Sequence, residues 1–200
     1  MGNVVKQTYK VTVEQRRKQS GHNSFVIWLF GLSGSGKSTI ANALEQALFD
    51  EGKRTYVLDG DNLRFGINQN LGFSSEDRTE NQRRVAEIAK LMVDAGTITI
   101  AAFISPLRSD REMVKAIVGK ENFFEVFVNT PISECEKRDV KGLYKKARAG
   151  VIQNFTGISA VFEKPEGDIL TIDTSQIPLN KAVVIIRNAL SDHLNKPAFE

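Results

Sequence analysis

The segment Gly31–Ser38, with the sequence Gly-Leu-Ser-Gly-Ser-Gly-Lys-Ser, constrains the fold of this chain more than any other. It follows the apolar run Val26–Phe30 and precedes the helical pattern Thr39–Phe49. The pattern G-x-x-x-x-G-K-S in this context predicts a loop whose backbone N–H groups surround phosphate oxygens. Glycines let the backbone curl, and the following helix adds the positive end of its dipole. A chance glycine-rich turn is the alternative.

Two side chains of this phosphate loop have roles that follow from their chemistry. Lys37 offers a cation to the β- and γ-phosphates, and Ser38 offers a hydroxyl to Mg²⁺. The loop predicts nucleotide binding, but it does not distinguish a kinase from a GTPase, a motor or a transporter subunit. We expect ATP and Mg²⁺ as ligands, held by Gly31, Leu32, Ser33, Gly34, Ser35, Gly36, Lys37, Ser38 and Thr39, with Ser38 as the metal ligand.

Short apolar runs alternate with helical patterns along the chain. Runs that are apolar on both faces are typical of strands buried between helical layers. The alternation predicts the α/β class, with a three-layer P-loop NTPase fold and a mostly parallel sheet of about five strands flanked by helices. The expected strands are Phe25–Phe30, Thr55–Leu58, Thr97–Ile104, Phe123–Val128 and Asp168–Ile172. The expected helices are Lys37–Glu51, Glu76–Ala95, Ser109–Val118, Ile132–Ala149 with a break, and Leu179–Leu194.

Length and charge narrow the class of protein. The 200 residues fit a single P-loop kinase domain, with an N-terminal arm at 1–22 and a mobile lid and substrate-capping segment at about 137–165. The net charge of +3 is too small to suggest nucleic acid or membrane as a partner. The chain has no signal-peptide pattern and no apolar run that could span a bilayer. Cys135 is the only cysteine, so a reducing, cytoplasmic location is the simple expectation.

Two acidic residues follow the second expected strand, in the sequence Asp59-Gly60-Asp61. Residues just past the carboxyl ends of strands line the ligand crevice of an α/β sheet. Asp61 could accept the proton of an attacking hydroxyl or help to hold Mg²⁺ through water. The alternative is an Asp-Gly turn whose side chains cap the backbone, and this interpretation is favoured for Asp59.

A polar end on an otherwise apolar helix face predicts a second anion site. The stripe of the helix Glu76–Ala95 continues backward to Asn81 and Arg78, which suggests a pocket at its first turns. Arg78 and Arg64 could grip an anion through bidentate hydrogen bonds. Arg78 could instead pair with Glu80 or Asp77 on the surface.

Three later features complete the candidate crevice. Ser105 follows the third expected strand and could bind substrate, receive a phosphoryl group or cap the next helix. The basic segment from Lys137 to Arg148 is either a solvated face or a lid over the phosphates. Phe155 could stack on a base or belong to a core.

At these motifs the chain resembles the adenylylsulfate kinase (APS kinase) family, in its stand-alone form. The resemblance covers nearly the whole chain and includes five motifs in order. They are GLSGSGKST (Gly31–Thr39), LDGDNLR (Leu58–Arg64), GFSSEDRTEN (Gly72–Asn81), AFISPLRSDRE (Ala102–Glu112) and KRDVKGLYKKARAG (Lys137–Gly150).

The resemblance implies a reaction, a set of site residues and an assembly. The reaction is transfer of the ATP γ-phosphoryl group to the ribose 3′-hydroxyl of adenosine 5′-phosphosulfate, in sulfate assimilation. Family members are commonly homodimers. Arg138 would lie near the ATP base, Asp61 near the 3′-hydroxyl, and Ser105 is the residue that the family names as a phosphoserine intermediate. The implied acceptor-binding residues are Asp61, Arg64, Phe73, Arg78, Asn81, Ile104, Ser105, Lys141, Leu143 and Phe155, with Phe73 and Phe155 on either side of the adenine.

Direct transfer is the mechanism that we expect, because in-line transfer needs alignment and cations but no covalent step. The expected catalytic residues are Lys37, Asp61 and Ser105. The nearest rival is another P-loop kinase, acting on a nucleoside monophosphate, a sugar acid or shikimate. A regulatory protein that binds nucleotide without turnover is a rival of another class, which the presence of Lys37, Arg78 and Lys141 disfavours.

Overall fold

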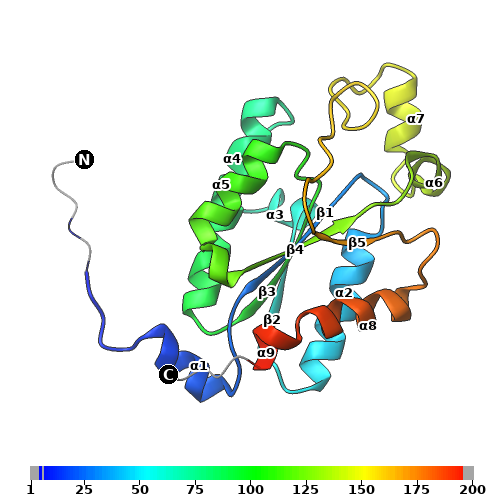
Figure 1. The fold of residues 1–200 in the computed structure, drawn as a ribbon. Helices are drawn as coiled ribbons and strands as arrows, with labels where there is room; N and C mark the ends of the chain where they lie inside the picture. Colours follow the sequence, from blue (N-terminus) through cyan, green and yellow to red (C-terminus); the bar gives the residue numbers. More distant parts are fainter. Residues whose placement is uncertain (1–4, 6, 196–200) are drawn as a thin grey trace.

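The computed structural model describes residue 5 and residues 7–195 (Figure 1). Residues 1–4, 6 and 196–200 lie outside the described residues, so the predicted arm is described only in part. The strands are β1 (Val26–Phe30), β2 (Thr55–Asp59), β3 (Ile98–Phe103), β4 (Phe123–Val128) and β5 (Leu170–Ile172). The helices are α1 (Val13–Ser20), α2 (Lys37–Asp50), α3 (Gly60–Leu63), α4 (Ser75–Asp94), α5 (Arg108–Val118), α6 (Ile132–Arg138), α7 (Leu143–Arg148), α8 (Leu179–Ala189) and α9 (Ser191–Asn195), with a 3₁₀ turn at Lys120–Asn122.

The five strands form one parallel sheet in the order β2-β3-β1-β4-β5, which confirms the predicted fold class. In the register of β1 with its two neighbours, Phe30 lies opposite Phe103 on one side and Phe127 on the other. The carboxyl ends of these three strands therefore meet at one edge. The chain passes from one side of β1 to the other between β3 and β4, and ligands bind at such a switch point in open α/β sheets.

Both faces of the central strand β1 are covered, which explains why its five residues are apolar and buried. Ile27 and Leu29 belong to the core beneath α2 and α8. Trp28 and Phe30 belong to the core beneath α4 and α5. Figure 1 shows these helix pairs on opposite faces of the sheet. Burying each side chain of this size contributes about 1.5–3 kcal/mol to the stability of the fold. The central strand therefore holds the start of the loop that follows it in place.

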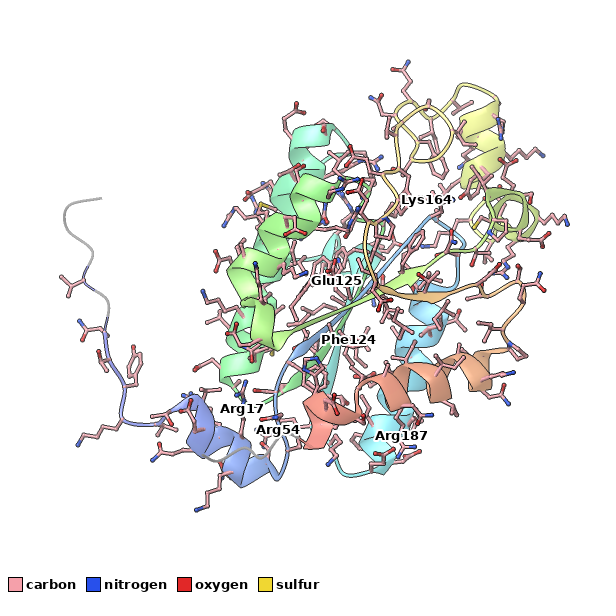
Figure 2. The ribbon with its side chains drawn as sticks, in the orientation of Figure 1. Arg17, Arg54, Phe124, Glu125, Lys164 and Arg187 are labelled. Atoms are coloured by element: carbon pink, nitrogen blue, oxygen red, sulfur yellow. The ribbon has the colours of Figure 1, made fainter. Side chains whose placement is uncertain are left out.

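The N-terminal helix and the predicted lid lie at opposite ends of the molecule (Figure 1). None of the eight residues of α1 is buried. Arg17 fastens α1 to the body by donating to Ser24 O at 2.8 Å and to Asn122 Oδ1 at 2.9 Å (Figure 2). The phosphate loop, α6 and α7 lie at the carboxyl edge of the sheet (Figure 1).

Most of the predicted elements are confirmed, including the break in one helix, and two differ. The predicted break within Ile132–Ala149 falls between α6 and α7, where Asp139 and Gly142 have positive φ angles of 21° and 64°. The single helix predicted over Leu179–Leu194 is wrong, because α8 ends at Ala189 and α9 begins at Ser191. The short helix α3 was expected as a turn. Asp59 begins it, since its side chain accepts from Asp61 N.

Candidate active site

The phosphate loop lies against the ends of β3 and β4. A Cβ atom added at Gly31 would be 2.4 Å from Val128 O, so this position has room only for glycine. Gly31 N donates to Ile104 O at 3.3 Å, which joins the loop to the segment after β3. Gly36 begins α2 with a positive φ of 100° and without a side-chain cap. The first N–H groups of α2 are therefore left for an anion.

Carbonyl groups of the loop are held by donors from other segments. The bonds run from Tyr144 Oη to Ser33 O (2.8 Å), from Arg138 Nη1 to Gly34 O (3.2 Å) and from Thr174 Oγ1 to Ser35 O (2.8 Å). Arg138 also donates to Thr174 O at 3.1 Å, so α6 and the segment after β5 support the loop together. Fixing these carbonyl groups pre-organises the loop, because its N–H groups keep their direction before a ligand arrives.

Lys37 is buried at the start of α2, with 8% of its surface exposed. Its ammonium group donates to Leu32 O at 2.7 Å and spans the loop. Burial lowers the pKa of Lys37 to about 8, although the charges of Cys135, Asp59 and Asp61 act in the opposite direction. A bound polyphosphate would raise that pKa again, because an anion favours the charged lysine. The predicted cation therefore lies inside the loop.

Oxygen atoms gather beside Ser38. Ser38 Oγ donates to Asp59 Oδ2 at 2.7 Å, and Asp59 Oδ1 accepts from Asp61 N at 3.0 Å. Asp61 forms an ion pair with Lys141, which comes from the segment between α6 and α7. A hydroxyl and a carboxylate beside a phosphate site suit Mg²⁺, which takes one or two carboxylates together with substrate phosphates and water. Within the part of the chain that is described, no group of three or more His, Cys, Asp or Glu side chains could hold a metal alone.

Arg64 and Arg78 form the other half of the site. Arg64 Nη1 donates to Leu71 O and Gly72 O at 3.0 and 2.8 Å, and its guanidinium lies 4.2 Å from the centroid of the Phe73 ring. Among the described residues, neither arginine has a carboxylate within 4.0 Å. Burial, and then the like charge of Arg64, lower the pKa of Arg78. Two neighbouring cations with no carboxylate in contact suit an anionic ligand, although the charges of Asp61 and Asp77 act on Arg64 from beyond 4.0 Å.

Arg78 also links α4 to the segment that follows α7. Its guanidinium donates to Phe73 O (3.0 Å), to Thr156 Oγ1 (2.7 Å) and to Asn154 O (2.8 Å). The surface pairing with Glu80 or Asp77 is therefore wrong. The predicted polar end of the α4 stripe is confirmed, since Asn81 is 6% exposed on the same face as Arg78.

The segment after β3 holds Ser105 in a constrained position. Ser105 is 2% exposed and has a positive φ of 43°. Its hydroxyl accepts from Trp28 Nε1 at 2.9 Å, and its carbonyl accepts from Arg111 Nη1 at 2.8 Å. The alternative in which Ser105 caps the next helix is wrong, because Leu107 is the N-cap residue of α5.

The two predicted base-stacking rings lie in different surroundings. Phe73 is 64% exposed, whereas Phe155 is 7% exposed. The ring of Phe155 packs edge-on against Tyr144 at 5.0 Å, in a small core that Leu143 also contacts. Phe155 is thus part of a hydrophobic core, and its stacking on a base stays a prediction.

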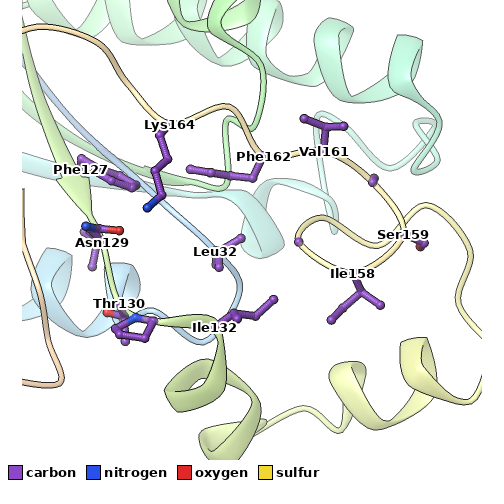
Figure 3. Close-up of a pocket in the computed structure, with 14 residues that line it drawn as sticks. Leu32, Phe127, Asn129, Thr130, Ile132, Ile158, Ser159, Val161, Phe162 and Lys164 are labelled. Atoms are coloured by element: carbon purple, nitrogen blue, oxygen red, sulfur yellow. The ribbon is translucent and has the colours of Figure 1, made fainter.

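A cavity of about 570 Å³ opens beside the phosphate loop (Figure 3). It lies between the end of β4 and residues 157–164, and Leu32 is its contact with the loop. Arg64, Arg78 and Asn81 do not line it. The candidate anion site is thus distinct from this cavity.

Asp59 is the site residue that sequence reasoning left out. For Asp59 the sequence favours a turn whose side chain caps the backbone, and Asp59 does cap α3. Its second oxygen nevertheless reaches Ser38. The signal was its place as the last residue of β2, where a strand points into the crevice.

Comparison with known proteins decides the family. A family model described as "Adenylylsulphate kinase" matches residues 23–173. The chain belongs to the adenylylsulphate kinase family.

Relatives and solved structures agree with this assignment. Adenylyl-sulfate kinase from Staphylococcus epidermidis is 56% identical over 92% of both chains. The one from Bacteroides thetaiotaomicron is 60% identical over 86% of both. The structure of the Mycobacterium tuberculosis APS kinase CysC in complex with AMPPNP and APS matches with a TM-score of 0.82 and 42% identity, over 84% of this chain and 98% of that one. This member of the adenylylsulphate kinase family is therefore a nucleotide-binding P-loop kinase.

The burial of Lys37 predicts a pH dependence of nucleotide binding. Lys37 must be charged to hold phosphate, and its pKa in the free protein is about 8. We expect the affinity for ATP, measured by calorimetry, to fall as the pH rises from about 7.5 to about 9.5, approaching tenfold per unit above the pKa. Any remaining ionisation of ATP over this range adds negative charge, which would strengthen binding rather than weaken it.

Lys37→Ala is the matched control, which we expect to bind ATP weakly without this pH dependence. An affinity of the natural protein that is constant across the range would contradict the role of Lys37.

Proposed function

We propose that this chain transfers the γ-phosphoryl group of ATP to the ribose 3′-hydroxyl of adenosine 5′-phosphosulfate. The products would be ADP and 3′-phosphoadenylyl sulfate. The observation that carries the proposal is the pairing of a phosphate loop with a second cationic site, Arg64 and Arg78, at the same edge of the sheet. The membership of the adenylylsulphate kinase family supports this choice of acceptor.

The donor half binds ATP through residues 31–39. Backbone N–H groups and Lys37 would hold the phosphates, and Arg138, which supports Gly34 and Thr174, would lie toward the base. Ser38 and Asp59 would hold Mg²⁺, since their oxygens are adjacent. When bound, Mg²⁺ neutralises charge on the phosphates.

The acceptor half binds the phosphosulfate and the adenosine. The anion would accept hydrogen bonds from Arg64, Arg78 and Asn81. Arg78 and Asn81 lie in the first turns of α4, and Arg64 contacts the loop before it. Phe73 is exposed and would stack on the adenine, with Phe155 as the second ring. Ile104, Ser105, Lys141 and Leu143 would complete the pocket.

Asp61 would align the attacking hydroxyl and accept its proton. Lys141 forms an ion pair with Asp61, so a substrate hydroxyl must enter beside this contact. The transfer would be direct, from ATP to the 3′-hydroxyl. The hydroxyl of Ser105 is buried and bonded to Trp28, which favours a positioning role for Ser105 over a phosphorylated intermediate.

Residues 137–165 would act as the mobile lid and substrate-capping segment. They carry the cations Arg138 and Lys141 and the core around Phe155. We also propose that residues 1–200 form a single domain with an arm at 1–22. The protein would be a homodimer, and it would act in the cytoplasm in sulfate assimilation. Among the described residues, no helix has the length and apolar character needed to cross a membrane.

A coupled assay of ADP release tests the acceptor. We expect release with adenosine 5′-phosphosulfate and none with adenylate, gluconate or shikimate. Lys37→Ala should lower turnover by about a hundredfold or more, because it removes the cation on the transferring phosphoryl group. Release with adenylate or gluconate and none with adenosine 5′-phosphosulfate would contradict the proposal, as would nucleotide binding without any turnover.

Ser105→Ala separates the two routes of transfer. If transfer is direct, this variant should keep substantial activity, with a loss of about tenfold at most from the lost hydrogen bond to Trp28. Measurement of kcat together with the binding of both substrates checks this. Complete loss of kcat with intact binding would support a phosphoserine intermediate instead.

A further inference from the structure

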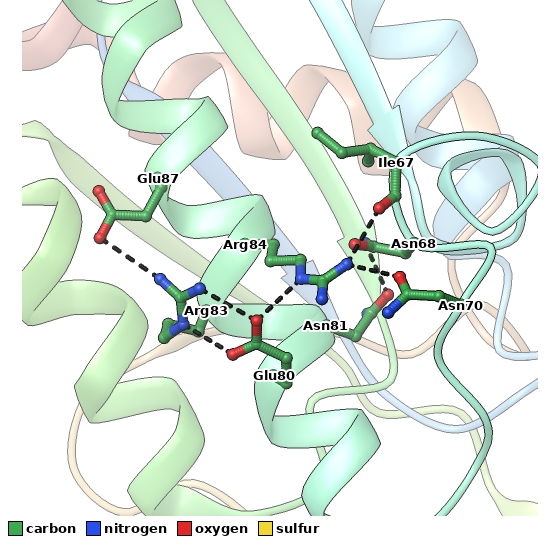
Figure 4. Close-up of polar contacts among 8 residues, drawn as sticks. All are labelled: Ile67, Asn68, Asn70, Glu80, Asn81, Arg83, Arg84 and Glu87. Carbon is green, nitrogen blue, oxygen red and sulfur yellow. Dashed lines mark hydrogen bonds and ion pairs between the residues drawn. The ribbon is translucent and has the colours of Figure 1, made fainter.

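The amide of Asn81 is held in one orientation by a buried neighbour, Asn68. Asn68 is fully buried in the loop between α3 and α4, and its Nδ2 donates to Asn81 Oδ1 at 2.9 Å. Figure 4 shows this contact beside the first turns of α4. Because Asn81 Oδ1 is turned toward Asn68, the NH2 group of Asn81 must point elsewhere.

The loop that carries Asn68 is fixed at several points. Asn68 N donates to Leu63 O and Leu71 N donates to Asn68 O, both at 3.0 Å. Arg84 on α4 donates to Ile67 O at 3.1 Å and to Asn70 Oδ1 at 2.8 Å (Figure 4). Asn68 therefore has little freedom to reorient, and it sets the polarity of the Asn81 amide.

The bonding of this pair is incomplete in a way that points to a ligand. Within residues 5 and 7–195, Asn68 Oδ1 is buried without a hydrogen-bond partner. Asn81 Nδ2 has no acceptor among these residues and is not one of the buried unpartnered atoms, so it is open to solvent. Leaving Asn68 Oδ1 unpaired costs stability, so stability alone does not explain a polar pair at this position, whereas the solvent-open Asn81 Nδ2 is a donor available to a ligand. Asn81 lies one helical turn from Arg78, so its free NH2 group is placed beside that cation.

We propose that Asn68 is a positioning residue, which fixes the Asn81 amide so that its NH2 group faces the anion of the acceptor. The inference rests on the proposed function, in which Asn81 contacts the phosphosulfate. An NH2 group attracts an anion and a carbonyl oxygen repels it, so the orientation of one amide contributes to the choice of a charged acceptor.

Two variants with matched controls test this role. Asn68→Leu removes the donor but keeps the size of the side chain, and it should raise the KM for adenosine 5′-phosphosulfate by about tenfold. The KM for ATP and the melting temperature should change little. Asn68→Asp places an acceptor opposite Asn81 and would turn the amide around. It should raise the same KM further, by about a hundredfold when the carboxylate is ionised.

Asn70→Ala is the control for loosening of the loop, because Asn70 bonds to Arg84 but not to Asn81. It should leave every constant near the natural value. In an Asn81→Ala background, Asn68→Leu should have no further effect, since there is no amide left to orient.

An unchanged KM in Asn68→Leu, or equal effects of Asn68→Leu and Asn70→Ala, would overturn the inference while leaving the proposed function intact. Should Asn68→Leu not fold, Asn68→Asp decides alone, and an unchanged KM in that variant overturns the inference as well. Absence of turnover by the natural protein would overturn both proposals.

Discussion

The contact of the Gly31 backbone with the ends of β3 and β4 is the constraint on which the rest of the site depends. The carbonyl of Val128 leaves no room for a side chain at Gly31, and the N–H of Gly31 bonds to Ile104 O. These contacts follow from the place of β1 between β3 and β4 in a parallel sheet. They join the phosphate loop to the segment before Ser105 and to the end of β4.

Several cations of the candidate site are removed from solvent. Lys37, Arg64 and Arg78 are each desolvated, which lowers the pKa of all three. Desolvated cations destabilise the free protein, and anionic ligands relieve that cost. Asp59 and Asp61 come between Lys37 and Arg64 in the sequence. Asp59 accepts a hydrogen bond from Ser38, and Asp61 forms an ion pair with Lys141. The arrangement suits a reaction in which two highly charged anions must approach each other.

The support of the site comes from segments that are far apart in the sequence. Tyr144, Arg138 and Thr174 hold the carbonyl groups of the loop, and Trp28 and Arg111 hold Ser105. Arg78 joins α4 to the segment with Phe155, so binding of an anion at Arg78 and the position of the capping segment are physically connected.

The fold could be predicted from the sequence because its signals are local. The apolar runs of β1, β3 and β4 and the glycine pattern at Gly31 each identify an element without reference to the others. The position of Ser38, Arg78 and Asn81 could be predicted for the same reason, since strand ends and helix faces fix them.

Long-range partners could not be predicted. No local pattern indicates that Asp59 reaches Ser38, that Trp28 bonds to Ser105, or that Asn68 holds Asn81. The break at Leu190 was missed because apolar residues continue across it with helical spacing. These features depend on tertiary packing, which brings together residues that the sequence separates.

The central claim is that one crevice holds two anions in separate halves, and calorimetric titration of two variants tests it most directly. Lys37→Met should lose most of its affinity for ATP but still bind adenosine 5′-phosphosulfate, and Arg78→Met should show the reverse. Affinity changes of about tenfold or more in the substituted half, with changes of threefold or less in the other, would agree with the account. Loss of both ligands in both variants, or undiminished binding of adenosine 5′-phosphosulfate by Arg78→Met, would contradict it.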